Sequence, residues 1–236
     1  MENNLGKQPK YPQDISQYAQ VCLDALVANR LGKNLSLGGA VGLAYYYEYR
    51  PTHDVDAWWQ NDATNEDRKA VIHCLEVVLQ PYGNVRTRAW GDVVSVELTP
   101  PGQKQVAFSF QIAQRSAQLA PSLPAPWPEG LQVDSLPDLL ASKMVALIER
   151  GAPRDFRDIY TLCQARLTTS EQCWQFWQQR QGLGGGDDNL ERAHLAIRTH
   201  LARITAQRPL EKITDLAERA AAEQLRTWFE REFLDV

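Results

Sequence analysis

LSLGGAVGLAYYYEYRPTHDVDAWW, residues 35–59, is the stretch that decides the fold. The short apolar segment at residues 35–37 predicts a strand that leads into Gly38-Gly39. The two glycines predict a tight turn, and residues 40–49 predict a helix that begins there. DVDAWW, residues 54–59, predicts the next strand. Strand, turn, helix and strand in this order indicate a domain built around a sheet.

Asp54 and Asp56 are the sharpest chemical feature of this stretch. Residues two apart in a strand share a face, so both carboxylates point one way while Val55 points into the core. Two carboxylates this close repel each other unless a cation lies between them. Mg²⁺ prefers oxygen ligands and is commonly shared with substrate phosphates. The alternative, two exposed aspartates at the edge of a loop, is the commoner origin of a bare Asp-x-Asp motif.

Gly38-Gly39 is the second feature of the same stretch. Without side chains, the turn lets a phosphate approach the backbone, and the start of the following helix offers free N–H groups. Arg50 and Thr52 lie between the glycines and the acids and belong to the same constellation. A Gly-Gly pair is also a common tight turn, so this feature alone does not identify a site.

The flanking sequence supplies the other elements of the sheet domain. Apolar periodicity predicts a helix over residues 14–31, capped by Asp14, and a second helix that begins at Thr64 with Asp67 in a capping box. Strands are predicted over residues 85–90, 93–98 and 105–112, with Pro100-Pro101-Gly102 joining the last two as a hairpin.

After a proline-rich connector, the chain is predicted to be helical. Helices are expected over residues 135–150, 154–167, 189–207 and 210–233, and GLGGG at residues 182–186 is expected to be a flexible joint. We therefore predict an α/β (α+β) fold, with a mixed sheet and flanking helices in residues 1–133. A helical domain is predicted for residues 134–236.

Lys143 lies in the first helix after the connector, on the same stripe as Leu139 and Leu147. A lysine on an apolar stripe must extend its amine to solvent or find an anion. A nucleotide phosphate and a carboxylate of the chain are both open at this point. Asp155 and Asp158 share a face of the next helix, either as part of a solvated, salt-bridged helix or near phosphates.

Composition excludes several classes of protein. The net charge of −4 and the pI of about 5.6 argue against a globally basic surface for nucleic acids. Four cysteines without a CxxC pair indicate buried thiols in a reducing compartment rather than disulfides or zinc. No apolar run approaches the ~20 residues that span a bilayer, and the N-terminus lacks the apolar core of a signal peptide. We expect a cytoplasmic protein without a membrane partner.

Two blocks of the sequence, taken together, resemble the AbiEii/AbiGii-type toxin nucleotidyltransferase family, within the polymerase-β-like nucleotidyltransferase superfamily. The first block is a strand, a glycine turn and Arg-x-Thr-x-Asp-x-Asp. The second is a helix lysine followed by Arg-Asp-x-x-Asp. The matching residues of this chain are Gly38, Gly39, Arg50, Thr52, Asp54, Asp56, Lys143, Arg154, Asp155 and Asp158.

The resemblance implies a polymerase-β-like nucleotidyltransferase fold and an enzyme that moves a nucleotidyl group from an NTP to an acceptor. In such a site Gly38, Gly39, Arg50, Thr52 and Lys143 bind the nucleotide. Asp54 and Asp56 hold Mg²⁺ or Mn²⁺, and Asp155 and Asp158 join Lys143 among the catalytic residues. The acceptor could be RNA, a protein or a small molecule, and many members of the family are toxins that have an antitoxin partner.

One position departs from the pattern of many enzymes with this fold, which carry a third carboxylate on a following strand. The strand predicted here, VAFSFQIA, has Ala107, Ser109 and Gln111 on its polar face and no acid. Glu97, on the neighbouring strand, is a possible substitute. The alternative is a catalytically degenerate module that binds nucleotides or a partner without turnover.

Overall fold

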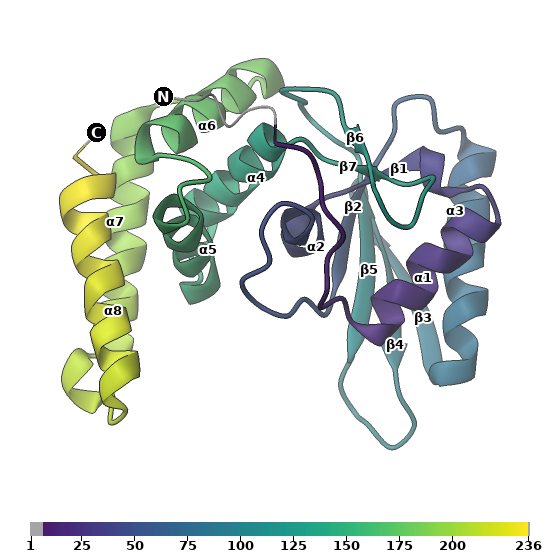
Figure 1. The fold of residues 1–236 in the computed structure, drawn as a ribbon, viewed down its shortest axis with the longest axis horizontal. Coiled ribbons are helices and arrows are strands. Elements are labelled where there is room, and N and C mark those ends of the chain that lie inside the picture. Colours follow the sequence, from purple (N-terminus) through teal and green to yellow (C-terminus); the bar gives the residue numbers. More distant parts are fainter. Residues whose placement is uncertain (1–6, 236) are drawn as a thin grey trace. The chain divides into compact units, whose positions relative to one another are not determined.

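The computed structural model describes residues 7–235, which form two compact units (Figure 1). The first unit runs up to Leu139 and contains the sheet, whereas the second begins at Leu140 and is helical. No helix among the described residues is both long and apolar enough to span a bilayer. The expected division after Val133 remains a proposal.

The first unit is built on a mixed sheet. Its strands are β1 (Leu35–Leu37), β2 (Val55–Trp59), β3 (Asn84–Trp90), β4 (Val93–Thr99), β5 (Phe108–Ala113), β6 (Leu123–Pro124) and β7 (Gln132–Val133). Their order across the sheet is β3-β4-β5-β2-β1-β7-β6. β2 runs parallel to β5 and β1 runs parallel to β7, while the other neighbours are antiparallel. The predicted mixed sheet is confirmed, and β2 lies near its centre.

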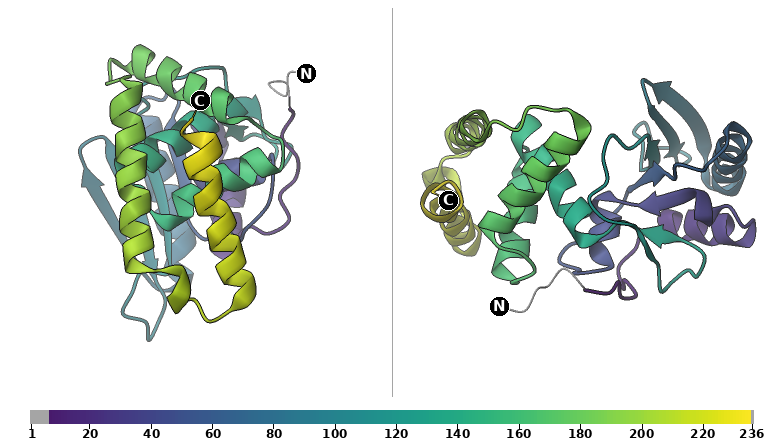
Figure 2. Two further views of the ribbon diagram at one scale, coloured as in Figure 1. Left: turned by 90° about the vertical axis from the view of Figure 1, so that its left-hand side faces the viewer. Right: turned by 90° about the horizontal axis from the view of Figure 1, so that it is seen from above.

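One face of this sheet is apolar and is covered by helices. α1 (Gln17–Ala28) and α3 (Asn65–Leu79) lie side by side against it, as Figures 1 and 2 show. Val55 of β2 and Phe110 of β5 are fully buried on this face. Burying one such side chain contributes about 1.5–3 kcal/mol, so alternation along the strands fixes which face meets the helices.

Local capping explains where the helices begin. The Thr64 side chain accepts from the Asp67 N–H, and the Asp67 carboxylate accepts from the Thr64 N–H, as the sequence predicted. The hydrogen bonds from Thr64 lower the pKa of Asp67. The predicted start of α1 at Asp14 is wrong, because Ser16 is the cap. The Asp14 N–H instead donates to the carboxylate of Glu48.

Two other predicted boundaries of the first unit are too wide. The helix after the glycine turn, α2 (Gly39–Ala44), was predicted to reach residue 49. It ends early because Glu48 turns away to hold the backbone N–H groups of the segment before α1. β5 begins at Phe108 rather than at residue 105, since the hairpin loop extends to that point.

The division between the units falls within α4 (Leu136–Glu149), after its first turn. The rest of α4 belongs to the second unit, and more helices follow it. These are α5 (Pro153–Gln164), α6 (Ser170–Gly184), α7 (Leu190–Gln207) and α8 (Leu216–Trp228), with a 3-10 turn at Leu210–Lys212 and a π-helical turn at Phe229–Phe233. The sequence did not predict α6, although Thr169 and Gln172 form a capping box at its start. The single helix predicted over residues 210–233 is wrong. Asp215 caps a new helix, α8, after the buried side chain of Ile213.

Aromatic side chains form the core between α6 and the C-terminal segment. Trp174 packs against Trp177 and Phe233, with ring centroids 5.8 and 5.3 Å away. The Trp174 indole N–H also donates to the Phe233 carbonyl at 3.1 Å. Trp174 and Trp177 are both buried and are therefore core residues of the helical unit.

Candidate functional site

Strand β2 and the residue that precedes it place the two acids of the Asp-x-Asp motif on one face of the sheet. Val55 and Ala57 are buried on the helix-covered face, whereas Asp54 is exposed and Asp56 is half-buried. The alternation follows from the two-residue period of a strand. The polar face of β2 therefore presents two carboxylates one strand step apart.

The glycine turn lies directly against Asp56. The Gly38 N–H donates to the Asp56 carbonyl at 2.8 Å, which ties the start of α2 to the middle of β2. Gly39 has a φ of +56°, a left-handed conformation that other residues rarely adopt. A Cβ at Gly39 would lie 2.1 Å from Asp56 Oδ2. Glycine is therefore required here both by the backbone and by the carboxylate that occupies the space of a side chain.

Asp54 is oriented by the neighbouring strand. Its Oδ1 accepts from the Ser109 N–H at 2.8 Å and from the Ser109 hydroxyl at 3.0 Å. Two donors on one oxygen fix the direction of the carboxylate at the edge of β2. Sequence reasoning placed Ser109 on the polar face but did not find this role, because β2 and β5 are far apart in the chain.

The strand register decides where a third carboxylate would lie. Asp56 pairs directly with Gln111 of β5, so an amide occupies the neighbouring position on the polar face. Glu97 lies one strand further away, opposite Ser109, and its Oε1 is 3.5 Å from Arg88 Nη1. In the folded sheet, β5 therefore places Gln111 and no carboxylate beside Asp56.

A buried charge network that sequence reasoning missed lies beside the glycine turn. Arg115 Nη2 donates to Ser36 Oγ at 2.6 Å and to the carboxylate of Asp134, and its Nη1 lies 3.7 Å from Asp138. Burial raises the pKa of Asp134, and the Arg115 guanidinium opposes this effect. Asp134 Oδ2 has no hydrogen-bond partner among the described residues. The sequence did not predict this network, because it joins Ser36 and Arg115 to acids that lie further along the chain.

Arg50 and Thr52 lie in the segment that enters β2. Thr52 is buried, pairs through its backbone with Ile15, and has a hydroxyl without a hydrogen-bond partner in residues 7–235. The Arg50 guanidinium lies over the Tyr49 ring at 5.7 Å from its centroid. That either side chain contacts a nucleotide stays a prediction.

The second constellation forms its own ion pairs in the helical unit. Lys143 Nζ of α4 lies 2.7 Å from Asp158 Oδ2 of α5, and both side chains are buried. The sequence left two anions open as partners of Lys143, a phosphate and a carboxylate, and the structure shows the carboxylate of Asp158. Asp155 is held by Arg150 through two hydrogen bonds of 2.9 and 2.7 Å and by the Ala152 N–H. That Lys143 also reaches the acids of β2 stays a prediction.

The donor set on β2 fits a hard divalent cation shared with a substrate. Two carboxylates are what Mg²⁺ commonly takes from a protein when phosphates and water complete its octahedron. Within residues 7–235, no group of three His, Cys, Asp or Glu side chains is arranged to hold a metal. All four cysteines are free; Cys22 and Cys173 are buried, whereas Cys74 and Cys163 are half-buried. A metal at this site would therefore depend on the substrate for part of its coordination.

Comparison with protein families matches residues 21–233 to the family described as nucleotidyl transferase AbiEii toxin, type IV TA system. The chain belongs to this family. The resemblance noted from Gly38-Gly39, the Asp-x-Asp motif and the Lys143 helix is thereby confirmed, and the AbiEii match extends beyond both blocks to the C-terminal helices. No curated protein matches the chain.

Solved structures from Helicobacter pylori resemble the fold of this chain. JHP933 from Helicobacter pylori is similar over 91% of this chain and 91% of its own, with 14% identity and a TM-score of 0.52. At this identity the likeness shows the fold alone. MenT4, a nucleotidyltransferase toxin from Mycobacterium tuberculosis, is similar over 90% of this chain and 94% of its own, with 16% identity. Its TM-score of 0.39 is too low to support an argument.

The contact between Gly39 and Asp56 makes a prediction for stability. Gly39→Ala should lower the free energy of unfolding by about 3 kcal/mol or more, because left-handed strain adds to a steric clash. Gly91→Ala is the matched control. Gly91 has a φ of +52° but open space around its Cα, so only the strain of about 1–2 kcal/mol is expected there. Urea unfolding of both variants measures the difference, and equal losses would contradict the clash.

The buried pair of Lys143 and Asp158 makes a second prediction. Lys143→Met should lower the free energy of unfolding by about 3–5 kcal/mol, because it removes the ammonium group that pairs with the buried Asp158 carboxylate. The double variant Lys143→Met/Asp158→Leu should recover most of the loss, since an apolar pair of similar size avoids desolvating a charge. Chemical denaturation followed by circular dichroism measures both. A double variant as unstable as the single one would show that the pair does not act as a unit.

Proposed function

We propose that this AbiEii-family protein transfers a nucleotidyl group from an NTP to an acceptor, at a site built around Asp54 and Asp56. The observation that carries the proposal is the close approach of the Asp56 carboxylate to the backbone of Gly39. This contact brings a cation-binding acid and a side-chain-free backbone turn together, as a metal-bound triphosphate would need. The family match supports the same reaction.

In the proposed reaction, a nucleophile of the acceptor attacks the α-phosphorus of the NTP and pyrophosphate leaves. Asp54 and Asp56 would hold Mg²⁺ or Mn²⁺, which would neutralise charge on the phosphates. Ser109 holds the Asp54 carboxylate in one direction, and the glycine turn leaves the backbone open to phosphate oxygens. Positioning and charge neutralisation carry most of the catalysis in phosphoryl chemistry of this kind.

The helix residues of the second block have positioning roles in this proposal. Asp158 holds the Lys143 amine in place at 2.7 Å, and Asp155 braces the turn between α4 and α5 through Arg150. Lys143 would contact phosphates of the nucleotide, as the family resemblance implies. This role requires the amine to share its charge between Asp158 and the substrate.

The family description also motivates a biological role. We propose that the chain is the toxin of a toxin–antitoxin pair, because the family that it belongs to is described in these terms. The acceptor would then be a cellular molecule whose modification stops growth. Co-expression with the product of the neighbouring reading frame should restore growth if that product is the antitoxin.

A second candidate function is nucleotide binding without turnover. Gln111 favours it, because the strand position directly opposite Asp56 carries an amide where a third carboxylate would assist catalysis. Calorimetry with Mg²⁺–NTP distinguishes the two functions. Binding without transfer to any acceptor would favour the second, whereas binding with release of pyrophosphate would favour the first.

Transfer itself is tested with α-labelled NTPs, Mg²⁺ and a cell extract as the source of acceptors. Asp56→Asn should lower the rate of labelling by about 100-fold or more, because it removes a charge that faces the metal and phosphates. Asp62→Asn, an exposed carboxylate beyond the end of β2, is the matched control and should retain full activity. Labelling that survives in Asp56→Asn would contradict the proposed site.

Glu97 tests whether a distant acid replaces the missing one. Because Glu97 lies two strands from β2 and is close to Arg88, Glu97→Gln should lower the labelling rate by less than about tenfold. The same labelling assay measures it. A loss as large as that of Asp56→Asn would instead identify Glu97 as a third metal ligand.

A further inference from the structure

A cavity of about 490 Å³ lies within the helical unit, between α5, α7 and α8. Its walls are mainly apolar. Phe156 and Tyr160 come from α5, Leu201 and Ile204 from α7, and Leu225 from α8. Ligand sites for small molecules have this size and this predominance of apolar and aromatic lining. The cavity is therefore large enough to enclose a small organic molecule.

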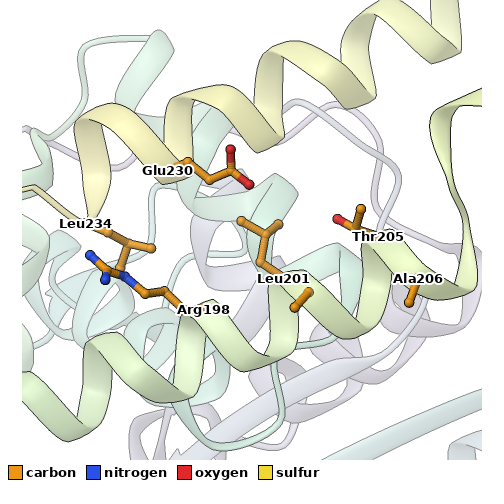
Figure 3. A pocket seen from close by; sticks show the side chains of 7 residues that line it. Arg198, Leu201, Thr205, Ala206, Glu230 and Leu234 are labelled. Carbon is orange, nitrogen blue, oxygen red and sulfur yellow. The ribbon is translucent and has the colours of Figure 1, made fainter.

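A second pocket lies between α7 and the C-terminal segment that carries Glu230 and Leu234. Figure 3 shows the adjoining hollow, in which Leu201 projects between α7 and the segment that carries Glu230 and Leu234. Leu201 lines both spaces. The side chains of this helix pair thus leave room on both sides of Leu201, and an apolar body could extend along α7.

The cavity is also lined by a largely buried cation, Arg226. Arg226 is 8% exposed and its Nη2 donates to the Arg208 carbonyl at 2.6 Å. Its Nη1 is buried without a hydrogen-bond partner among the described residues. A buried guanidinium that is only partly paired is costly, so its charge favours an anionic group in the cavity beside it.

The other charged groups of the lining leave the balance positive. Arg208 Nη2 lies 2.7 Å from Glu218 Oε1, so these two charges offset each other. Arg157 is exposed and lines the same cavity from α5. Arg157 and Arg226 therefore remain as two cations beside an apolar wall. This combination suits a single anionic head group attached to an apolar body.

We propose that this cavity binds a small amphipathic carboxylate, with its apolar body along α7 and its head group on Arg226 and Arg157. The carboxylate matches the planar fork of a guanidinium and can accept two parallel hydrogen bonds. The apolar lining does not suit a triphosphate, whose several charges would lack partners there. The site is separate from the face of α5 that carries Asp158, which pairs with Lys143 of α4.

Calorimetric titration of the full chain tests the proposal with decanoate as the probe. Decanamide supplies the same body without the charge, and acetate supplies the head group without the body. Decanoate should bind at one site per chain and about tenfold or more tighter than decanamide, because hydrogen bonds to charged groups are lost in the amide. Acetate should show no binding. Equal affinity for decanoate and decanamide would overturn the role of the arginines.

Two pairs of variants locate the site. Ala222→Trp fills the cavity from α8 and should abolish decanoate binding, whereas Ala220→Trp, on the exposed surface of α8 outside the cavity, should leave it unchanged. Arg157→Ala should weaken decanoate about tenfold, and Arg231→Ala, an exposed arginine outside the cavity, should have no effect. Arg157 is exposed, so its variant tests the site even if Ala222→Trp does not fold. Unchanged binding in Arg157→Ala would overturn the proposal.

Discussion

The contact on which the candidate site depends is the close approach of the Asp56 carboxylate to the backbone of Gly39. A left-handed glycine and a hydrogen bond from the Gly38 N–H to the Asp56 carbonyl hold the turn against the middle of β2. No side chain fits between them. This contact sets the distance between the glycine turn, which would bind phosphates, and the acids at β2, which would bind a cation. The helices α1 and α3 support the sheet on its apolar face.

The two units differ in how far their acidic side chains are paired with cations. The sheet unit exposes Asp54 on its polar face and leaves Asp134 Oδ2 buried and unpaired within the described residues. The helical unit neutralises its buried acids internally, with Lys143 on Asp158 and Arg150 on Asp155. A site for an anionic substrate needs positive charge that is not fully committed. By this reasoning, the Lys143 amine can serve a nucleotide only as a shared charge, whereas Arg226 has a donor to spare.

Local signals explain what could be predicted from the sequence. The alternation along DVDAWW and the capping box at Thr64 each depend on residues within one turn or strand step, and the structure contains both. The fold class followed from the order of such elements. What could not be predicted depends on contacts between distant segments. Glu48 shortens α2 by binding the segment before α1, and Arg115 joins Ser36 to Asp134. The partner of Lys143 stayed open for the same reason, because a stripe on one helix does not identify the residue that faces it.

The hold on Asp54 has a consequence for how this chain can vary. One of its two bonds comes from the hydroxyl of Ser109, but the other comes from the backbone N–H of the same residue. Any amino acid except proline offers that N–H. Alanine, valine or glycine at position 109 would therefore still orient the Asp54 carboxylate through the backbone N–H. This interaction depends on the pairing of two parallel strands and not on the identity of residue 109. Related sequences could therefore keep it without conserving a serine at this position.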